Sequence, residues 1–361
     1  MPSRLHIVHT ESSAGWGGQE LRILTESRGM IARGHRLTLI APAETRISAE
    51  AGKYGVETVA LTIAKKRPRG VFALRRWLAA NRPDVVNTHS STDSWLAALS
   101  GWAPIVRTRH ISAPVRANFA NRWLYGSATR RVVTTGEFLR RHLLETLRLA
   151  PGHVVSIPTG IDLEKFDRSK TRSARPELGI PADALVFGIV ATLRSWKGHQ
   201  QLLDAFEKLP VKTHLVIAGD GPQRAPIESR IAGSGLRSRI HFLGHRDDVP
   251  ELLAAMDCFV LPSYANEGVP QAIVQAMAME LPVVSTRVGA IDEAVRDGET
   301  GILLPAKDPA ALAAAMRSLA ENSSKRNEFG AAGRRLAERE FSLERMLASM
   351  EAVFYAAASS R

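Results

Sequence analysis

The strongest constraint on the fold is an alternation of short β-rich segments with helical segments, which runs along the chain twice. The β-rich runs of the first half are LHIVHT, RLTLIAP, VETVAL, DVVNTHS, IVRTRH and RRVVTTG, and helical patterns such as FLRRHLLETLRLA lie between them. Strands separated by helices of this length pair in parallel through right-handed crossovers. The alternation therefore predicts an α/β protein with doubly wound parallel sheets.

A second series of strands follows a Pro- and Gly-containing stretch near residues 158–181. Its β-rich runs are LVFGIVATL, HLVIAGDG, IHFLG, CFVLPS, PVVST and GILLPA. Because 361 residues exceed one ordinary core, we expect two domains, over 1–165 and 180–342. A closing helix over 343–361 must bury an apolar stripe. The stripe consists of Leu343, Met346, Leu347, Met350, Val353, Phe354 and Ala357.

The positive charge is concentrated in the first half. Residues 1–160 hold 23 Lys and Arg against 10 Asp and Glu, whereas the remainder holds 25 against 26. This excess suits an anionic membrane surface or an anionic acceptor, with a solvated basic face as the alternative. Nucleic acid is disfavoured, because no aromatic stacking platform is interleaved with the basic residues. In IAKKRPRGVFALRRWL the apolar residues fit either a membrane interface or the buried face of a helix: Val71, Phe72, Leu74, Trp77 and Leu78.

The chain shows no features of an exported protein. Its single cysteine, Cys258, excludes an internal disulfide and is expected to be a buried structural thiol. The first residues lack the pattern of a signal peptide, and no apolar run reaches the roughly 20 residues of a spanning helix. We expect a cytoplasmic protein, attached peripherally to the inner face of the cytoplasmic membrane if the basic half binds lipid.

Glycines follow the first strand in SSAGWGGQE. Gly15, Gly17 and Gly18 allow a tight turn, and the helix N-terminus behind them favours an anion. The spacing is not G-x-G-x-x-G, and the second strand ends without an acidic residue, which argues against a nicotinamide cofactor. A glycine turn without a ligand is the alternative.

Two loops of the second half suit a sugar nucleotide. In ATLRSWKGHQ, Arg194 and Lys197 precede a helix that starts near Gly198, and two cations at a helix N-terminus suit a diphosphate. In SYANEGVPQAIVQAMAME, Glu267 lies in a loop after a strand, and Gln275 follows within the next helix. A carboxylate and an amide there could hold a sugar and a ribose. Between these segments, AGDGP places Gly221 in a turn that ends a strand, and we interpret this turn as structural.

The strings WKGHQQLLDAF, LVIAGDGP, FLGHRDDV and YANEGVPQAIVQAMAMELPVVST, in this order, resemble glycosyltransferase family 4, the retaining enzymes of the GT-B fold. The resemblance covers nearly the whole chain and is strongest over about residues 185–316. It implies two Rossmann-like domains that face a central cleft, with the closing helix crossing back to complete the first domain.

The resemblance also implies roles for individual residues. Lys197 would contact the donor diphosphate, and Glu267, the first acid of an E-x7-E element, would hold sugar hydroxyls. His110 would lie near the reaction centre, so the implied catalytic residues are Glu267, His110 and Lys197. The implied donor-side residues are Gly17, Gly18, Arg194, Lys197, Gly221, Glu267, Gly268, Val269 and Gln275, and those on the acceptor side are His89 and Arg109. Each histidine has a supporting, hydrogen-bonded role as its alternative.

Two positions depart from the family pattern. Gln275 replaces the second acid, so an uncharged amide would meet the ribose. The arginine of the usual G-R-L-x-x-x-K-G falls at Thr192, with Arg194 two residues on.

The implied function is a retaining, metal-independent transfer of a hexosyl group, without a cofactor. The donor would be a nucleotide-diphosphate sugar, and the acceptor a glycan or lipid-linked molecule of cell-envelope polysaccharide or lipopolysaccharide synthesis. Fixed cations would replace a metal ion, and no D-x-D follows a strand. The alternatives are a sugar-nucleotide epimerase of the same fold and a sugar-nucleotide-binding protein that has lost catalysis, which only Gln275 supports.

Overall fold

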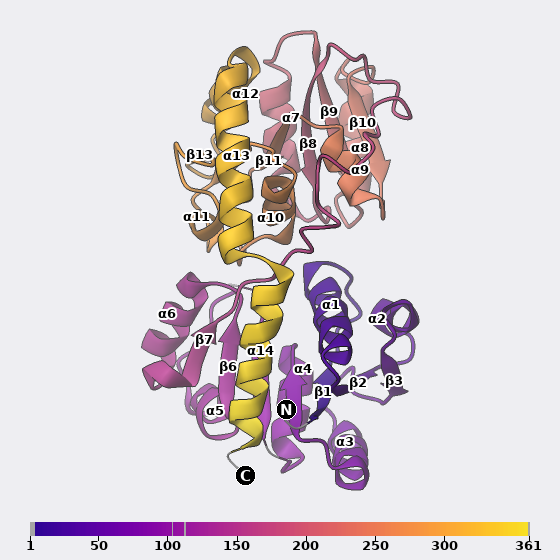
Figure 1. Ribbon diagram of the computed structural model, residues 1–361, viewed down its shortest axis with the longest axis vertical. Helices are drawn as coiled ribbons and strands as arrows, with labels where there is room; N and C mark the ends of the chain where they lie inside the picture. Colours follow the sequence, from indigo (N-terminus) through magenta and orange to yellow (C-terminus); the bar gives the residue numbers. More distant parts are fainter. Residues whose placement is uncertain (1–3, 103, 112, 360–361) are drawn as a thin grey trace. The chain divides into compact units, whose positions relative to one another are not determined.

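The computed structural model describes residues 4–359 except 103 and 112. The chain forms two compact units, and each has its own parallel sheet (Figure 1). Unit 1 comprises Met1–Thr159 with Glu344–Arg361, and unit 2 comprises Gly160–Leu343. The predicted class, two Rossmann-like parallel-sheet domains, is confirmed.

The sheet of unit 1 has seven parallel strands in the order β3-β2-β1-β4-β5-β6-β7. Its first six strands lie where the sequence predicts them, and the short β7 was not predicted because it is only three residues long. The register is regular, with Ile7 of β1 opposite both Leu37 of β2 and Val85 of β4. The strands are β1 (His6–Thr10), β2 (Arg36–Ala41), β3 (Glu57–Ala60), β4 (Val85–Thr88), β5 (Ile105–Arg109), β6 (Arg131–Thr134) and β7 (Val154–Ser156).

Helices cover both faces of this sheet, because side chains of one strand alternate between them. Val8 faces a core shared with α3 and α4, whereas its neighbour His9 faces α1 and α14. The helices of unit 1 are α1 (Gly18–Ala32), α2 (Arg46–Glu50), η1 (Ala51–Tyr54), α3 (Pro68–Asn81), α4 (Ser91–Leu99), α5 (Phe119–Arg122), η2 (Trp123–Ser127), α6 (Glu137–Leu147), η3 (Pro151–His153) and α14 (Leu343–Ala358).

The C-terminal helix α14 packs on α1 through the predicted stripe. Met350 and Phe354 are fully buried, and the ring of Phe354 meets that of His9 edge-on. Arg33 and His35 donate hydrogen bonds to the Glu351 carboxylate. A helix at the end of the chain thereby fills the core of the unit that the start of the chain builds (Figure 1).

The sheet of unit 2 has six parallel strands in the order β10-β9-β8-β11-β12-β13, all at predicted positions. Its strands are β8 (Leu185–Val190), β9 (Thr213–Ala218), β10 (Ile240–Gly244), β11 (Cys258–Leu261), β12 (Val283–Thr286) and β13 (Gly301–Leu304). Its helices are η4 (Ser195–Lys197), α7 (His199–Phe206), α8 (Arg224–Gly233), α9 (Val249–Ala254), α10 (Gln271–Ala278), α11 (Ile291–Ala294), α12 (Pro309–Glu321) and α13 (Ser323–Glu340).

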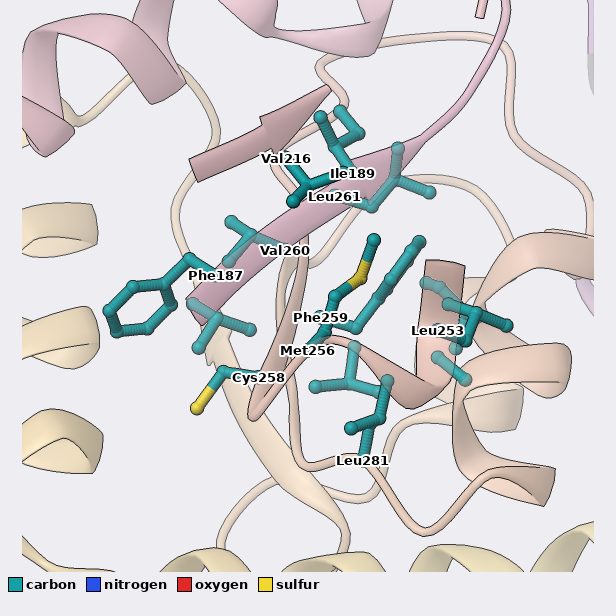
Figure 2. Close-up of a cluster of buried hydrophobic side chains, with 14 of the residues drawn as sticks. Phe187, Ile189, Val216, Leu253, Met256, Cys258, Phe259, Val260, Leu261 and Leu281 are labelled. Atoms are coloured by element: carbon teal, nitrogen blue, oxygen red, sulfur yellow. The ribbon is translucent and has the colours of Figure 1, made fainter. Parts of the chain in front are cut away.

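Cys258 lies in the hydrophobic core of unit 2, as predicted. Figure 2 shows its side chain on the same side as Phe187 of β8 and pointing away from Phe259, the next residue of β11. The cysteine is fully buried, and this burial raises the pKa of its thiol. Because a thiolate is the reactive form, Cys258 is a packing residue.

The apolar residues of α3 do not form a membrane-facing surface. Leu74 and Leu78 are fully buried, and Val71 and Trp77 pack against the same core, so only Phe72 of the five is exposed. The interfacial interpretation of this stretch is therefore wrong for its apolar part, because a helix beside a sheet must bury its apolar face. No helix in the described part of the chain is long and apolar enough to cross a membrane.

Each sheet contains one point at which the strand order reverses. In unit 1 it lies between β1 and β4, and in unit 2 between β8 and β11. The loops that follow these neighbouring strands lead to helices on opposite faces, which leaves room for a ligand at the carboxyl ends of the strands. Ligand sites are therefore expected at the two reversal points.

The packing of α13 in unit 2 supplies a test of the fold. A Cβ at Gly330 would lie 2.1 Å from the carbonyl oxygen of Glu280, which follows α10. A Cβ at Gly333 would lie 3.4 Å from the Met277 side chain, an ordinary van der Waals distance. Gly330→Ala should therefore cost about 1–3 kcal/mol of unfolding free energy. Gly333→Ala should be neutral or stabilise by up to about 1 kcal/mol, because alanine favours the helix. Urea unfolding of the two variants measures both, and equal midpoints would contradict this packing.

Candidate functional site

Lys197 and Glu267 form an ion pair at the reversal point of unit 2. Lys197 ends η4 after β8, and Glu267 lies in the loop after β11, so the neighbouring strands bring together residues that are distant in sequence. Lys197 Nζ donates to Glu267 Oε1 at 2.7 Å and to Oε2 at 3.0 Å. The side chains are 18% and 5% exposed, respectively. The structure therefore joins two residues that the sequence singled out separately.

The loop carrying Lys197 is held against the loop carrying Glu267 by close backbone packing. Gly198 has a φ of 78°, and a Cβ there would lie 2.1 Å from the Pro262 carbonyl oxygen. Only glycine permits this conformation together with this approach. Tyr264 N also donates to the Trp196 carbonyl oxygen at 2.8 Å. The ion pair thus rests on a fixed pair of loops.

Glu267 is buried, although it lies in a loop. It is 4% exposed, and Ser263 Oγ donates to its Oε1 at 2.6 Å. Its own carbonyl oxygen accepts from Ala290 N, and Gly289 packs directly beneath it. A loop position therefore does not leave Glu267 exposed to solvent. Ser263 was not predicted, and no sequence signal distinguishes it from other serines.

The other predicted donor-side residues of unit 2 differ in their exposure to solvent. Arg194 is exposed, with its guanidinium 5.7 Å from the Trp196 ring centroid, and Gln275 is half-buried in α10. Gly268 and Val269 are buried just before that helix, which begins after Pro270 rather than at it. Gly221 has a structural reason to be glycine, because a Cβ would lie 2.8 Å from the Leu193 carbonyl oxygen.

Three histidines form a hydrogen-bonded chain in unit 1. His9 Nδ1 lies 2.7 Å from His89 Nε2, and His89 Nδ1 lies 2.9 Å from His110 Nε2. His9 lies within β1, one residue before its end, His89 follows β4 at the reversal point, and His110 follows β5. The predicted residues His89 and His110 are thus neighbours. His9 was missed, since a histidine within a strand carries no functional signal.

The two short contacts constrain the protons of this chain. A neutral imidazole donates through one ring nitrogen and accepts through the other, so the ring protons of the three histidines all point the same way along the chain. Asn87 Nδ2 also lies 3.5 Å from His9 Nδ1, and Thr108 Oγ1 donates to Asn87 Oδ1 at 2.9 Å.

Burial keeps these imidazoles neutral. Burial and the nearby Arg22 lower the pKa of His9 to about 3, and burial lowers the pKa of His89 and His110 well below the usual value. Behind His9, the fully buried Glu26 has a pKa raised by burial to about 7. Neutral rings are what this common direction of the ring protons requires.

The glycine loop after β1 is built differently from the prediction. Gly17 has a φ of 175°, an extended conformation open to any residue, and α1 begins at Gly18. The loop is anchored instead by Glu11, whose carboxylate accepts from Ser13 N, from Gln19 and from Ser90 Oγ. Burial raises the pKa of Glu11. Glu11 was not predicted, although its place directly after a strand is a recognisable signal.

Arg109, predicted on the acceptor side, lies at the end of β5. Its Nη1 donates to Tyr125 Oη at 3.0 Å, and its Nη2 donates to the Ala113 carbonyl oxygen. No group of three or more His, Cys, Asp or Glu residues suited to a metal ion occurs among residues 4–102, 104–111 and 113–359.

Comparison with known families accounts for both units. Residues 16–165 match the family "Glycosyltransferase Family 4", and residues 170–336 match "Glycosyl transferases group 1". A D-inositol 3-phosphate glycosyltransferase of Geodermatophilus obscurus is 31% identical over 76% of this chain and 67% of its own length. The chain belongs to the family 4, group 1 glycosyltransferases of GT-B type.

Two further comparisons agree with the assignment of this chain to the glycosyltransferases. A phosphatidyl-myo-inositol mannosyltransferase of Mycobacterium leprae is 29% identical over 88% of this chain and 87% of its own length. The solved structure of Anabaena HepE in complex with UDP-glucose superimposes with a TM-score of 0.83 at 20% identity, covering 98% of this chain and 100% of that chain. At this identity, the likeness to HepE shows a shared fold alone.

The ion pair of the glycosyltransferase can be tested by a double-mutant cycle. Lys197→Met or Glu267→Gln leaves one charged or polar partner unmatched in a mostly buried site, so each should cost about 2–3 kcal/mol of unfolding free energy. The double variant should cost about 1–3 kcal/mol less than the sum of the two. Chemical denaturation of all four proteins measures this coupling, and strictly additive costs would show that the pair does not interact.

Neutral His9 predicts a pH dependence of stability. The unfolded chain binds a proton at His9 below about pH 6.5, but the folded one does so only near pH 3. The stability that neutral His9 contributes is therefore complete above pH 6.5 and is lost as the pH falls toward 3, by about 1.4 kcal/mol per pH unit. Between pH 6.5 and 5 the wild type should lose about 2 kcal/mol more than His9→Asn. Urea titrations measure this, with His245→Asn, an exposed position in unit 2, as the control. Equal pH dependence in wild type and His9→Asn would refute it.

Proposed function

We propose that this glycosyltransferase moves a hexosyl group, with retention of configuration, from a nucleotide-diphosphate sugar to a glycan or lipid-linked acceptor. The observation that carries the proposal is the Lys197–Glu267 pair at the reversal point of unit 2. It joins a cation that precedes α7 to a carboxylate that precedes α10. A diphosphate requires the cation, and sugar hydroxyls require the carboxylate.

Lys197 and the N-terminus of α7 would hold the donor diphosphate. Negative charge grows on the diphosphate as the glycosidic bond breaks, so a fixed cation stabilises the transition state more than the bound donor. Arg194, exposed beside the same loop, would add a second cation. The backbone of Gly17 and Gly18 in unit 1 is a further candidate for phosphate contact. We propose that these groups make a metal ion unnecessary.

Glu267 would accept hydrogen bonds from hydroxyls of the transferred sugar. Ser263 and Lys197 already orient its carboxylate before a donor arrives, so little reorganisation is needed on binding. Gly268 and Val269 line the approach to α10, and the Gln275 amide would bond a ribose hydroxyl in place of the family's carboxylate. Gly221 would act indirectly, by supporting the loop that precedes Lys197.

Retention follows if the acceptor hydroxyl attacks the anomeric carbon on the face from which the diphosphate leaves. The carbon–oxygen bond to the diphosphate breaks, the bond to the acceptor oxygen forms, and a phosphate oxygen takes the hydroxyl proton. On the acceptor side, His110 Nδ1 would form a hydrogen bond with that hydroxyl, because His89 holds the other ring nitrogen. Arg109 at the end of β5 would also face the acceptor.

The relatives support the classes of donor and acceptor. One relative is named for an inositol phosphate, another for phosphatidyl-myo-inositol, and HepE holds UDP-glucose. An acceptor that carries phosphate also suits the excess of Lys and Arg in residues 1–160. We place the enzyme at the inner face of the cytoplasmic membrane, in the synthesis of a cell-envelope polysaccharide or lipopolysaccharide, and propose no nucleic acid as partner.

Donor binding and turnover test the proposal with one set of proteins. UDP, GDP or ADP should raise the melting temperature, and the matching nucleotide sugar should be consumed in the presence of a crude lipid-linked acceptor fraction. Glu267→Gln should reduce turnover at least about 100-fold, because the carboxylate acts on the reacting sugar. Glu280→Gln, an exposed position after α10, should not. Activity should survive EDTA.

Specific outcomes would favour other functions. Conversion of the nucleotide sugar without an acceptor would identify an epimerase, and nucleotide binding without any turnover would identify a binding protein. Activity abolished by EDTA and restored by Mg²⁺ or Mn²⁺ would overturn metal independence. Full turnover by Glu267→Gln would remove the proposed role of the carboxylate.

A further inference from the structure

Unit 1 contains a cluster of three cations that the proposed reaction does not use as a group. Arg107 and Arg109 lie two residues apart on β5, so they share one face of the sheet. Lys66, in the loop between β3 and α3, is the third. All three lie toward the carboxyl edge of the parallel sheet, and they are called the Arg107 cluster below.

Arg107 is the unusual member of the cluster. It is 3% exposed, and its Nε and Nη1 have no hydrogen-bond partner within the part of the chain that the structure describes. Its guanidinium carbon lies 4.3 Å from the centroid of the Tyr125 ring, which is a favourable cation–π contact. The Tyr125 side chain also hydrogen-bonds Arg107, but it neither neutralises the charge nor provides a partner for Nε and Nη1.

The carboxylate of Asp93 in the same region is already occupied. Its Oδ2 accepts from Thr10 Oγ1 at 2.7 Å and from His89 N at 2.9 Å. Its Oδ1 accepts from Ser90 N at 2.9 Å and from Ser12 Oγ at 3.3 Å. Burial and Glu11 also raise the pKa of Asp93 to about 7, which reduces its charge. Asp93 therefore cannot serve as the full counter-ion of Arg107.

The other two cations connect Arg107 to the surface. Arg109 donates to Tyr125 Oη, so both arginines contact one tyrosine, and the Nε of Arg109 is also without a partner among the described residues. Lys66 is exposed and donates to Ser91 Oγ at 3.2 Å, at the start of α4, with its Nζ 5.6 Å from the Trp95 ring centroid. Partial desolvation of its ammonium and, second, repulsion by Arg107 lower the pKa of Lys66. The cluster thus extends from solvent to a buried guanidinium.

Such an arrangement is costly without an anion. A buried guanidinium with two unmatched donor atoms loses its hydration, and two further cations nearby repel it. Packing would be served as well by methionine or leucine. A charged group retained at such a cost, with free in-plane donors, is the mark of a binding site.

We infer that the Arg107 cluster binds a phosphate group carried by the acceptor. A phosphate monoester has a charge near −2 and three acceptor oxygens, so it can neutralise two cations at once, whereas a carboxylate has a single negative charge and two oxygens. The fork of Arg107 suits its oxygens, and Lys66 supplies a point charge at the entrance. This deepens the proposed function and rests on it for the identification of the ligand as acceptor. The phosphate belongs to a soluble sugar phosphate or to a phospholipid headgroup.

Phosphate binding is measured by thermal shift in a Lys197→Met parent, which removes the proposed diphosphate contact of unit 2. Sodium phosphate, at an ionic strength matched with NaCl, should raise the melting temperature of the parent by about 5 °C at 100-fold excess over its Kd. Adding Arg107→Met should abolish this rise. Adding Arg141→Met, an exposed arginine on α6, should leave it unchanged.

The same variants separate a binding role from a structural one. Without phosphate, Arg107→Met should melt no lower than the parent, because it removes an unpaired buried charge. If it melts several degrees lower and phosphate has no effect on the parent, Arg107 is a structural residue and the inference is wrong. If Arg107→Met fails to fold, the surface variant Lys66→Met provides the test. It should weaken phosphate binding by about 5- to 10-fold. An unchanged Kd in that variant would overturn the inference.

Two further measurements distinguish the source of the phosphate. Glucose 6-phosphate that binds at least about tenfold more tightly than inorganic phosphate, through Arg107, identifies a soluble acceptor. Co-sedimentation with vesicles that contain phosphatidic acid, whose headgroup is a phosphate monoester, but not with phosphatidylcholine vesicles, identifies a headgroup if Arg107→Met abolishes it. Sedimentation that Arg107→Met leaves intact would assign membrane binding to other basic residues and count against this site as its cause.

The inference and the proposed function fail in different experiments. If nucleoside diphosphates do not stabilise the wild type while the phosphate response through Arg107 remains, the proposed function is wrong and the anion site stands. If nucleotide binding and turnover are normal while phosphate has no Arg107-dependent effect, the enzyme is as proposed and the anion site is wrong.

Discussion

Parallel strand pairing is the constraint on which both clusters of functional residues depend. When all strands of a sheet run the same way, every loop that follows a strand emerges at one edge. Where the strand order reverses, two such loops turn away from each other and leave accessible space between them. Lys197 and Glu267 follow the two strands at the reversal in unit 2, and His9 and His89 occupy the equivalent place in unit 1. The topology, more than any local sequence, brings these residues together.

The two units deal with buried charge in different ways. In unit 2 the charge is matched, since the Lys197 ammonium meets both oxygens of Glu267. In unit 1 it is largely suppressed, because burial holds the histidine chain neutral and raises the pKa of Asp93 toward neutrality. Matching suits a site that receives an anion and must release it, whereas neutral imidazoles suit a site that orients a hydroxyl. Arg107 follows neither pattern, which is why it points to a ligand.

Glycine fixes the geometry of the paired loops in unit 2. Gly198 allows the Lys197 loop to touch the backbone at Pro262, and Gly289, with a φ of 62°, packs its Cα against the carbonyl of Glu267. A side chain at either position would separate the loops and shift the ion pair by more than a hydrogen bond tolerates. By contrast, the extended Gly17 shows that a glycine-rich loop need not contain a glycine-specific conformation.

The sequence by itself determined the strand and helix series, the burial of Cys258, the stripe of α14 and the family, because hydrophobic periodicity and motif order are local properties of the chain. It also singled out Lys197, Glu267, His89 and His110 one at a time. Only the tertiary structure decided that these residues form pairs and chains, that Glu267 is buried, that most apolar residues of α3 face a core, and that two donor atoms of Arg107 have no hydrogen-bond partner among the described residues. Those outcomes depend on which distant loops the sheet brings together and on how much water remains around a charge, and neither can be read from local sequence.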